Sequence, residues 1–95
     1  MVKHIVMYKL KEPTEINKQA LKEKFLSMKG KIDLLVDIQS GVDEIKSDRS
    51  FDVVLVCEFK SMDDLEKYRV HPVHLPVMEY VKSVVEKSHS VDYEY

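Results

Sequence analysis

The stretch Val2–Leu10, with the sequence VKHIVMYKL, decides the fold, because it predicts a strand that is apolar on both faces. Successive side chains of a strand point to opposite faces of its sheet. One face here carries His4, Val6, Tyr8 and Leu10, and the other carries Ile5 and Met7. A strand of this kind needs cover on both sides, so we expect one layer of structure against each face.

Three further stretches predict strands. Phe51–Phe59 repeats the two-sided pattern, with Val53, Leu55, Cys57 and Phe59 opposite Val54 and Val56. A weaker strand is expected at Gly41–Ser47, which starts at a glycine and ends at a polar turn. Val91–Tyr95 closes the sequence with a cleaner alternation.

Three helices are expected between these strands. Thr14 is placed to cap the first, whose apolar stripe consists of Ile16, Ala20, Leu21, Phe25 and Met28. The second begins after the N-cap Ser61 and stops at Pro72. Pro76 suits the first turn of a third helix that runs to about Lys87.

The order strand, helix, strand, strand, two helices, strand predicts one domain over residues 1–95 with a ferredoxin-like α+β sandwich. Its four-stranded antiparallel sheet would have all three helices on one face. The opposite face would then be an exposed apolar surface in a monomer. We therefore expect a two-fold homodimer in which sheet packs against sheet and closes a dimeric α+β barrel.

The composition argues against several classes of protein. The 95 residues are 34% charged with a net charge of -2, so no basic face for nucleic acid is expected. The longest uncharged apolar stretch, Val53–Cys57, is too short to cross a membrane, and a cytoplasmic location is the default expectation. Cys57 is the only cysteine, so it is expected to be a core residue, with no internal disulfide and no cysteine-based metal site.

The segment Tyr68–His74, YRVHPVH, concentrates titratable chemistry, since it holds two imidazoles and a phenol within seven residues. A neutral imidazole can accept a proton near pH 7, and a phenol can hydrogen-bond a carbonyl or an enolate. The same segment also suits a purely structural corner between two helices, because His71 precedes Pro72 and is pushed toward an extended backbone.

Several segments together resemble the stress-responsive A/B barrel (Dabb) domain family. They are the opening Lys3–Leu10, Gly41-Val42, Phe51–Phe59, Tyr68-x-x-His71-Pro72-x-His74 and the closing Val91-Asp92-Tyr93. The resemblance spans nearly the whole chain, and it implies a dimeric α+β barrel. Most members of this family have no established biochemical activity.

The resemblance also implies roles for individual residues, because one plant member is a polyketide cyclase that needs no metal or organic cofactor. By this similarity, His74 would act as general base, Tyr68 would hydrogen-bond the developing enolate or carbonyl, and Asp92 would orient the imidazole. The residues that would line a ligand pocket are His4, Val6, Tyr8, Leu55 and His71. No cofactor and no metal ion is expected.

Three functional hypotheses follow. The first is a homodimer of unestablished activity that binds a small, partly apolar molecule beside Tyr68, His71 and His74. The second is a cofactor-independent cyclase or lyase that performs an intramolecular aldol condensation. The third is a stress-associated structural or interaction module, in which a His74–Asp92 contact ties the helical corner to the last strand. A metal site at His71, His74 and Glu79 is disfavoured, since the spacing straddles a proline.

Overall fold

The computed structural model describes residues 1–95 and contains four strands and three helices. In chain order they are β1 (Val2–Leu10), α1 (Glu15–Leu26), β2 (Asp37–Val42), β3 (Val53–Phe59), α2 (Met62–Arg69), α3 (His74–Val84) and β4 (Val85–Glu94). The strands form one sheet in the order β2-β3-β1-β4, and every neighbouring pair is antiparallel. The ferredoxin-like α+β fold predicted from the sequence is thereby confirmed.

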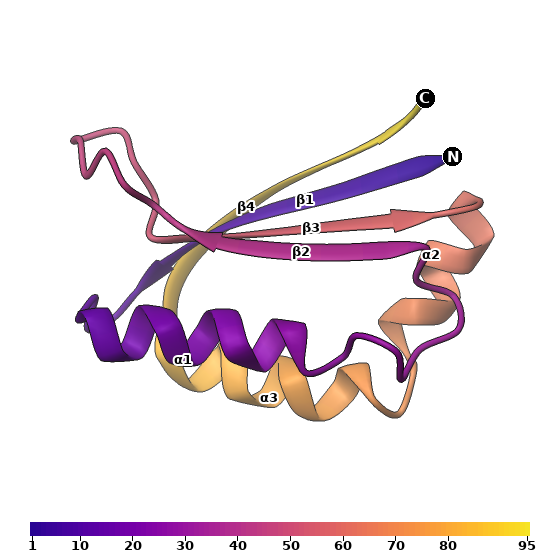
Figure 1. The fold of residues 1–95 in the computed structure, drawn as a ribbon, viewed down its shortest axis with the longest axis horizontal. Helices are drawn as coiled ribbons and strands as arrows, with labels where there is room; N and C mark the ends of the chain where they lie inside the picture. The colour runs from indigo at the N-terminus through magenta and orange to yellow at the C-terminus, as the bar shows by residue number, and fades with distance from the viewer.

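The two apolar strands lie side by side in the middle of the sheet. β1 pairs with β3 on one side and with β4 on the other, so that Val6 lies opposite Leu55 and His4 lies opposite Asp92. Figure 1 shows α1 and α3 below the sheet, with α2 at one end of it. All three helices therefore cover the same face, which we call the inner face.

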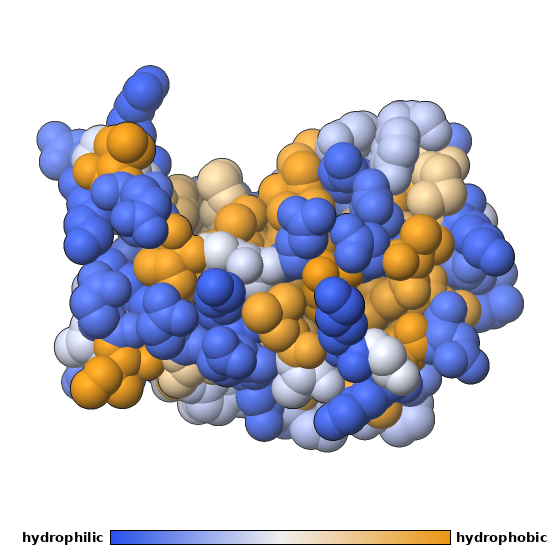
Figure 2. Space-filling model, in the orientation of Figure 1, coloured by the Kyte–Doolittle hydropathy of each residue, from blue (hydrophilic) through white to orange (hydrophobic).

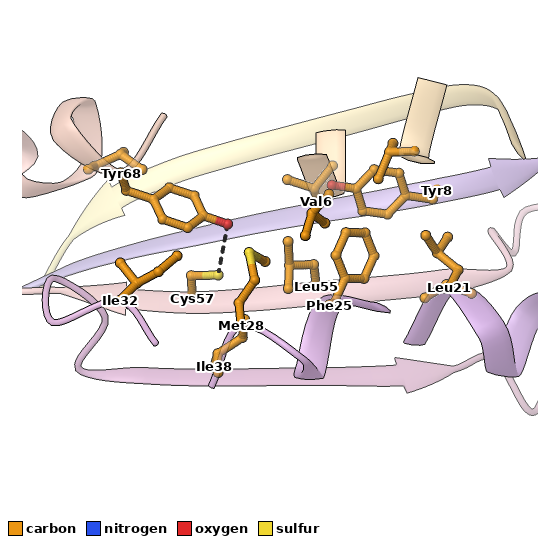
Figure 3. Packing of buried hydrophobic residues seen from close by; sticks show 14 of the residues in the cluster. Val6, Tyr8, Leu21, Phe25, Met28, Ile32, Ile38, Leu55, Cys57 and Tyr68 are labelled. Atoms are coloured by element: carbon orange, nitrogen blue, oxygen red, sulfur yellow. Dashed lines mark hydrogen bonds between the residues drawn. The ribbon is translucent and has the colours of Figure 1, made fainter. Parts of the chain in front are cut away.

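The core fills the space between the inner face and the helices. Seventeen buried apolar side chains form one cluster, and burial alternates along β3, where Val53, Leu55, Cys57 and Phe59 are buried. The helices contribute Leu21, Phe25, Leu65, Tyr68, Val77 and Val81. Figure 3 shows Phe25 and Met28 pointing up at the sheet between Tyr8 and Tyr68.

Side-chain caps fix the starts of two helices as expected. The Thr14 hydroxyl accepts a hydrogen bond from the Asn17 N–H at 3.1 Å, and the Ser61 hydroxyl accepts one from the Asp64 N–H at 3.1 Å. Each bond satisfies a backbone donor that the helix itself leaves free. The first helix differs from the predicted apolar stripe, since Ile16 is 82% exposed and Ala20 is also exposed, while Lys18 is buried.

The boundaries of β2 differ from the sequence-based prediction. β2 spans Asp37–Val42, so the prediction of a strand at Gly41–Ser47 was wrong except for its first two residues. Beyond Val42 the chain forms a polar loop in which the Asp43 carboxylate accepts from the Lys46 N–H at 2.6 Å. Lys46 has a φ of 58°, a left-handed conformation that does not continue a strand.

The last strand begins earlier than predicted, because α3 ends at Val84 and β4 continues directly from Val85. The sequence suggested that the helix runs to about Lys87 and that the strand begins only at Val91. The residues from Val85 onward instead pair with β1. β4 is an edge strand, so polar side chains are compatible with it.

The face of the sheet that carries no helix, which we call the outer face, has an apolar centre, flanked by Lys3 and Glu58 at one end and by Lys9 and Lys87 at the other. It holds Ile5, Met7, Val54, Val56, Val91 and Tyr93. Val91 is 54% exposed and Met7 is 41% exposed. Figure 2 shows the molecule hollowed along this upper side, between the projecting β2–β3 loop and the opposite end of the sheet. This is the uncovered apolar face that the two-sided strands predict.

None of the helices combines the length and the apolar character that crossing a bilayer requires.

Candidate functional site

A cavity of about 550 Å³ lies between the inner face and the helices α2 and α3. Seven of the side chains proposed from the sequence line it: His4, Val6, Tyr8, Leu55, Tyr68, His74 and Asp92. They come from β1, β3, β4, α2 and α3, so the fold brings together residues from both ends of the chain.

His74 presents one ring nitrogen to this space. It is the first residue of α3 and is only 8% exposed. Its Nδ1 lies 3.1 Å from the carbonyl oxygen of Arg69, the last residue of α2. Because a carbonyl can only accept, Nδ1 carries the proton in the neutral ring and Nε2 keeps a free lone pair. Burial lowers the pKa of His74, against a smaller opposing effect of the Arg69 carbonyl, and so favours this neutral form.

The second cavity imidazole, His4, is paired with Asp92. His4 Nδ1 hydrogen-bonds the Asp92 carboxylate across the β1–β4 pair, where the two residues are directly opposite. Facing residues of neighbouring strands bring their side chains together. The sequence suggested that Asp92 orients His74. This was wrong, because the register of β4 against β1 places the Asp92 carboxylate beside His4. His74 is held instead by the carbonyl oxygen of Arg69.

Tyr68 forms the wall beside His74. Its ring centroid lies 4.1 Å from that of His74 and 5.0 Å from that of Phe59. The hydroxyl points at the sheet, 4.0 Å from Cys57 Sγ (Figure 3). Burial raises the pKa of Tyr68 far above its usual range and that of Cys57 to about 12, so both groups stay protonated. The Tyr68 hydroxyl has no other hydrogen-bond partner.

His71 was expected to line the pocket, but it is not among the residues around the cavity. Its Nδ1 accepts a hydrogen bond from the Val73 N–H at 3.1 Å, and its carbonyl accepts from the N–H groups of His74 and Leu75. These bonds hold the corner between α2 and α3. The contacts of His71 therefore fit the structural corner between two helices rather than a ligand pocket.

Sequence reasoning missed the polar wall that β4 gives the cavity. Ser88, Ser90 and Asp92 alternate along β4 and face inward, opposite Tyr8, Val6 and His4. The signal was present as Ser88-x-Ser90-x-Asp92, an alternation of polar residues with the period of a strand. We predicted that this strand begins only at Val91, because Ser88 and Ser90 lack the apolar alternation of the central strands.

The cavity therefore combines apolar walls, two imidazoles, two protonated phenols and several charged residues, which are Asp92, Glu86, Arg69, Lys82 and Lys87. Nowhere in the molecule do three or more histidine, cysteine or carboxylate side chains gather closely enough to hold a metal ion. The residues present can bind a small molecule by shape and hydrogen bonds. They can also accept a proton, through the free Nε2 of His74.

Comparison with known proteins gives a family match over nearly the whole chain. Residues 2–95 match the model of the stress responsive A/B barrel domain. No curated protein matches the sequence.

Solved structures with the same fold include proteins with and without a stated activity. A dimeric protein of unknown function with a ferredoxin-like fold from Bacteroides fragilis is 27% identical, with a TM-score of 0.83 over 99% of this chain and 95% of that one. A Dabb family protein from Mesorhizobium loti is 19% identical, with a TM-score of 0.84 over 99% and 95%. The hydroxynitrile lyase of Passiflora edulis is 16% identical, with a TM-score of 0.82 over 97% and 90%.

Proposed function

Because the chain belongs to the stress responsive A/B barrel domain family, we propose that it acts as a homodimer whose subunits each bind a small, partly apolar molecule in the cavity. The observation that carries this proposal is the cavity of about 550 Å³ itself. Sites for small ligands commonly have volumes of about 300–1,000 Å³, with apolar walls and a few polar groups that fix orientation.

The residues that line the cavity indicate which kind of ligand it can bind. Val6 and Leu55 offer apolar surface, whereas Ser90 and the His4–Asp92 pair offer hydrogen bonds on the side of β4. This distribution suits a molecule with one apolar side and one polar side, such as a small aromatic compound with oxygen substituents.

Histidine resonances provide the test. We would record the NMR signals of the four histidines while adding small aromatic and β-diketone compounds. Binding in the cavity should shift the signals of His4 and His74. His89 is an internal control, because it lies on the outer face against Phe51, with ring centroids 5.3 Å apart. If no compound moves His4 or His74, or if all four histidines move alike, the proposal fails.

The free Nε2 of His74 favours a second candidate, a cofactor-independent cyclase or lyase. In this candidate His74 removes a proton from a carbon next to a carbonyl group, and Tyr68 is the phenol whose ring packs against the base. The hydroxynitrile lyase with the same fold is an enzyme, although its 16% identity carries only the fold. His74→Ala should abolish turnover of a β-diketone substrate and leave the circular dichroism spectrum unchanged. A loss of the folded state in this variant would instead assign His74 to the scaffold.

The dimer part of the proposal rests on the outer face. A sheet with exposed Met7, Val91 and Tyr93 buries them most simply against the same sheet of a second copy. The structure from Bacteroides fragilis is described as dimeric, which supports the same assembly here. Sedimentation velocity at micromolar concentration tests it, and a monomer would refute it.

A further inference from the structure

We propose that the Tyr8 hydroxyl is the hydrogen-bond donor by which the cavity selects its ligand, and that the ligand therefore carries a neutral acceptor such as a carbonyl oxygen. This inference rests on the proposed function and deepens it, because it adds a chemical class to the ligand. It starts from a difference between the two phenols of the site.

Tyr8 is enclosed but its hydroxyl is unpaired. The residue is 4% exposed and lines the cavity, and its ring packs on Phe25 with centroids 5.0 Å apart. The hydroxyl of Tyr68, by contrast, has Cys57 Sγ as a partner 4.0 Å away. No hydrogen bond is formed by the hydroxyl of Tyr8.

The Tyr8 hydroxyl nevertheless reaches open space. No polar side-chain atom in the protein is both fully enclosed and without a partner. Since Tyr8 has almost no contact with the outside, the open space at its hydroxyl is the cavity. Figure 3 shows this hydroxyl pointing along the sheet toward Val6, another cavity residue.

A hydroxyl in this position is suited to donate. Burial is the main cause that raises the pKa of Tyr8 well above its ordinary value, so the proton stays on the oxygen across the physiological range. The nearest ring is the apolar Phe25, and the facing residue on β3 is Val53. Ser88 faces Tyr8 on β4 but forms no hydrogen bond with it, so the proton of the hydroxyl is not committed within the protein. Buried polar groups are normally paired, and a ligand acceptor completes the pairing that the protein leaves open.

The ligand then meets groups of opposite kinds within one cavity. Tyr8 donates, whereas the neutral His74 accepts at Nε2 because its Nδ1–H is committed to the Arg69 carbonyl. A molecule with a carbonyl oxygen for Tyr8 and a hydroxyl or an acidic C–H for His74 satisfies both. An enolisable carbonyl compound or a hydroxylated aryl ketone has these features.

The experiment compares two probes of the same shape in two variants. Acetophenone carries a carbonyl oxygen, and α-methylstyrene replaces that oxygen by a CH₂ group. Binding is followed by the NMR shifts of His4 and His74. Wild-type protein should bind acetophenone roughly threefold to tenfold more tightly than α-methylstyrene, the range expected for one hydrogen bond. Tyr8→Phe should remove this preference and leave the affinity for α-methylstyrene unchanged.

Tyr80→Phe is the matched control, since Tyr80 lies on α3 and does not line the cavity. It should keep the preference for acetophenone. The melting temperature gives an independent readout, because deleting an unpaired hydroxyl removes no stabilising bond. Tyr8→Phe should therefore be at least as stable as wild type.

The outcomes separate this inference from the proposed function. If both probes bind and the preference survives in Tyr8→Phe, the role of Tyr8 is refuted and the ligand pocket stands. A clear drop in melting temperature of Tyr8→Phe would also refute it, because it would reveal an internal partner for the hydroxyl. If neither probe binds to the wild-type cavity, the pocket as a small-molecule site fails and this inference fails with it.

Discussion

Replacing Ile5 by glutamate places a carboxylate in the middle of the outer face. Ile5 lies on β1, with Val56 opposite it on β3 and Val91 opposite it on β4. All of its immediate cross-strand neighbours are therefore apolar, and none can pair with the new charge. In a two-fold dimer formed sheet against sheet, each of the two subunits would bury one such carboxylate in the interface.

The expected effect on the dimer is large. Removing an unpaired carboxylate from water costs several kcal/mol, so we take about 3 kcal/mol for each copy and about 6 kcal/mol for the dimer. This corresponds to a dissociation constant that is weaker by roughly 10⁴-fold. A dimer with a nanomolar dissociation constant would then be monomeric at about 1 μM.

Sedimentation velocity over a concentration series measures this change. Ile16→Glu is the matched control, because it makes the same substitution on α1, at a residue that is 82% exposed on the helical side of the molecule. Circular dichroism shows whether each variant folds. A folded Ile5→Glu variant that remains dimeric at the wild-type concentration would refute the assignment of the outer face to the dimer.

Three further predictions concern the site and its supports. Burial lowers the pKa of His74 below the value of about 6.5 that is expected in the unfolded chain. The unfolded state therefore takes up a proton first as the pH drops, and the stability of the folded state should fall below about pH 6.5. Melting temperatures measured from pH 8 to 5 should fall less steeply for His74→Gln than for the wild type. Asp92→Asn replaces the carboxylate that pairs with His4 and should shift the NMR signals of the His4 ring at a fixed pH of about 7, while unchanged His4 signals would argue against the pair. Ser61→Ala leaves the Asp64 N–H without its cap and should cost about 1 kcal/mol in urea unfolding, with Ser47→Ala, a loop serine, as the comparison.

The elements that the sequence predicted well are those with local signals. The alternation in Val2–Leu10 and Phe51–Phe59 follows from which side chains are buried, and the caps Thr14 and Ser61 act within three residues of their partners. Such patterns need no knowledge of the rest of the fold.

The parts that were missed depend on contacts between distant segments. The pairing of Asp92 with His4 follows from the register of β4 against β1, which the sequence of β4 alone does not contain. The start of β4 at Val85 depends on β1 as a hydrogen-bonding partner, since Ser88 and Ser90 have little tendency to form a strand by themselves. Whether the Tyr8 hydroxyl has a partner is likewise decided only once the helices are packed.

The polar wall of the cavity also lies at an edge of the sheet. β4 has a hydrogen-bonded neighbour on one side only, and the residues from Glu86 to Glu94 are all exposed. Segments of this kind separate locally from a fold while the core stays closed, so their amide protons exchange with solvent first. Because the exposed residues include Ser88, Ser90 and Asp92, the cavity opens to solvent along β4, and a ligand can enter there without any opening between the sheet and α1. Fraying of β4 would then remove the polar contacts of a bound ligand before the apolar ones.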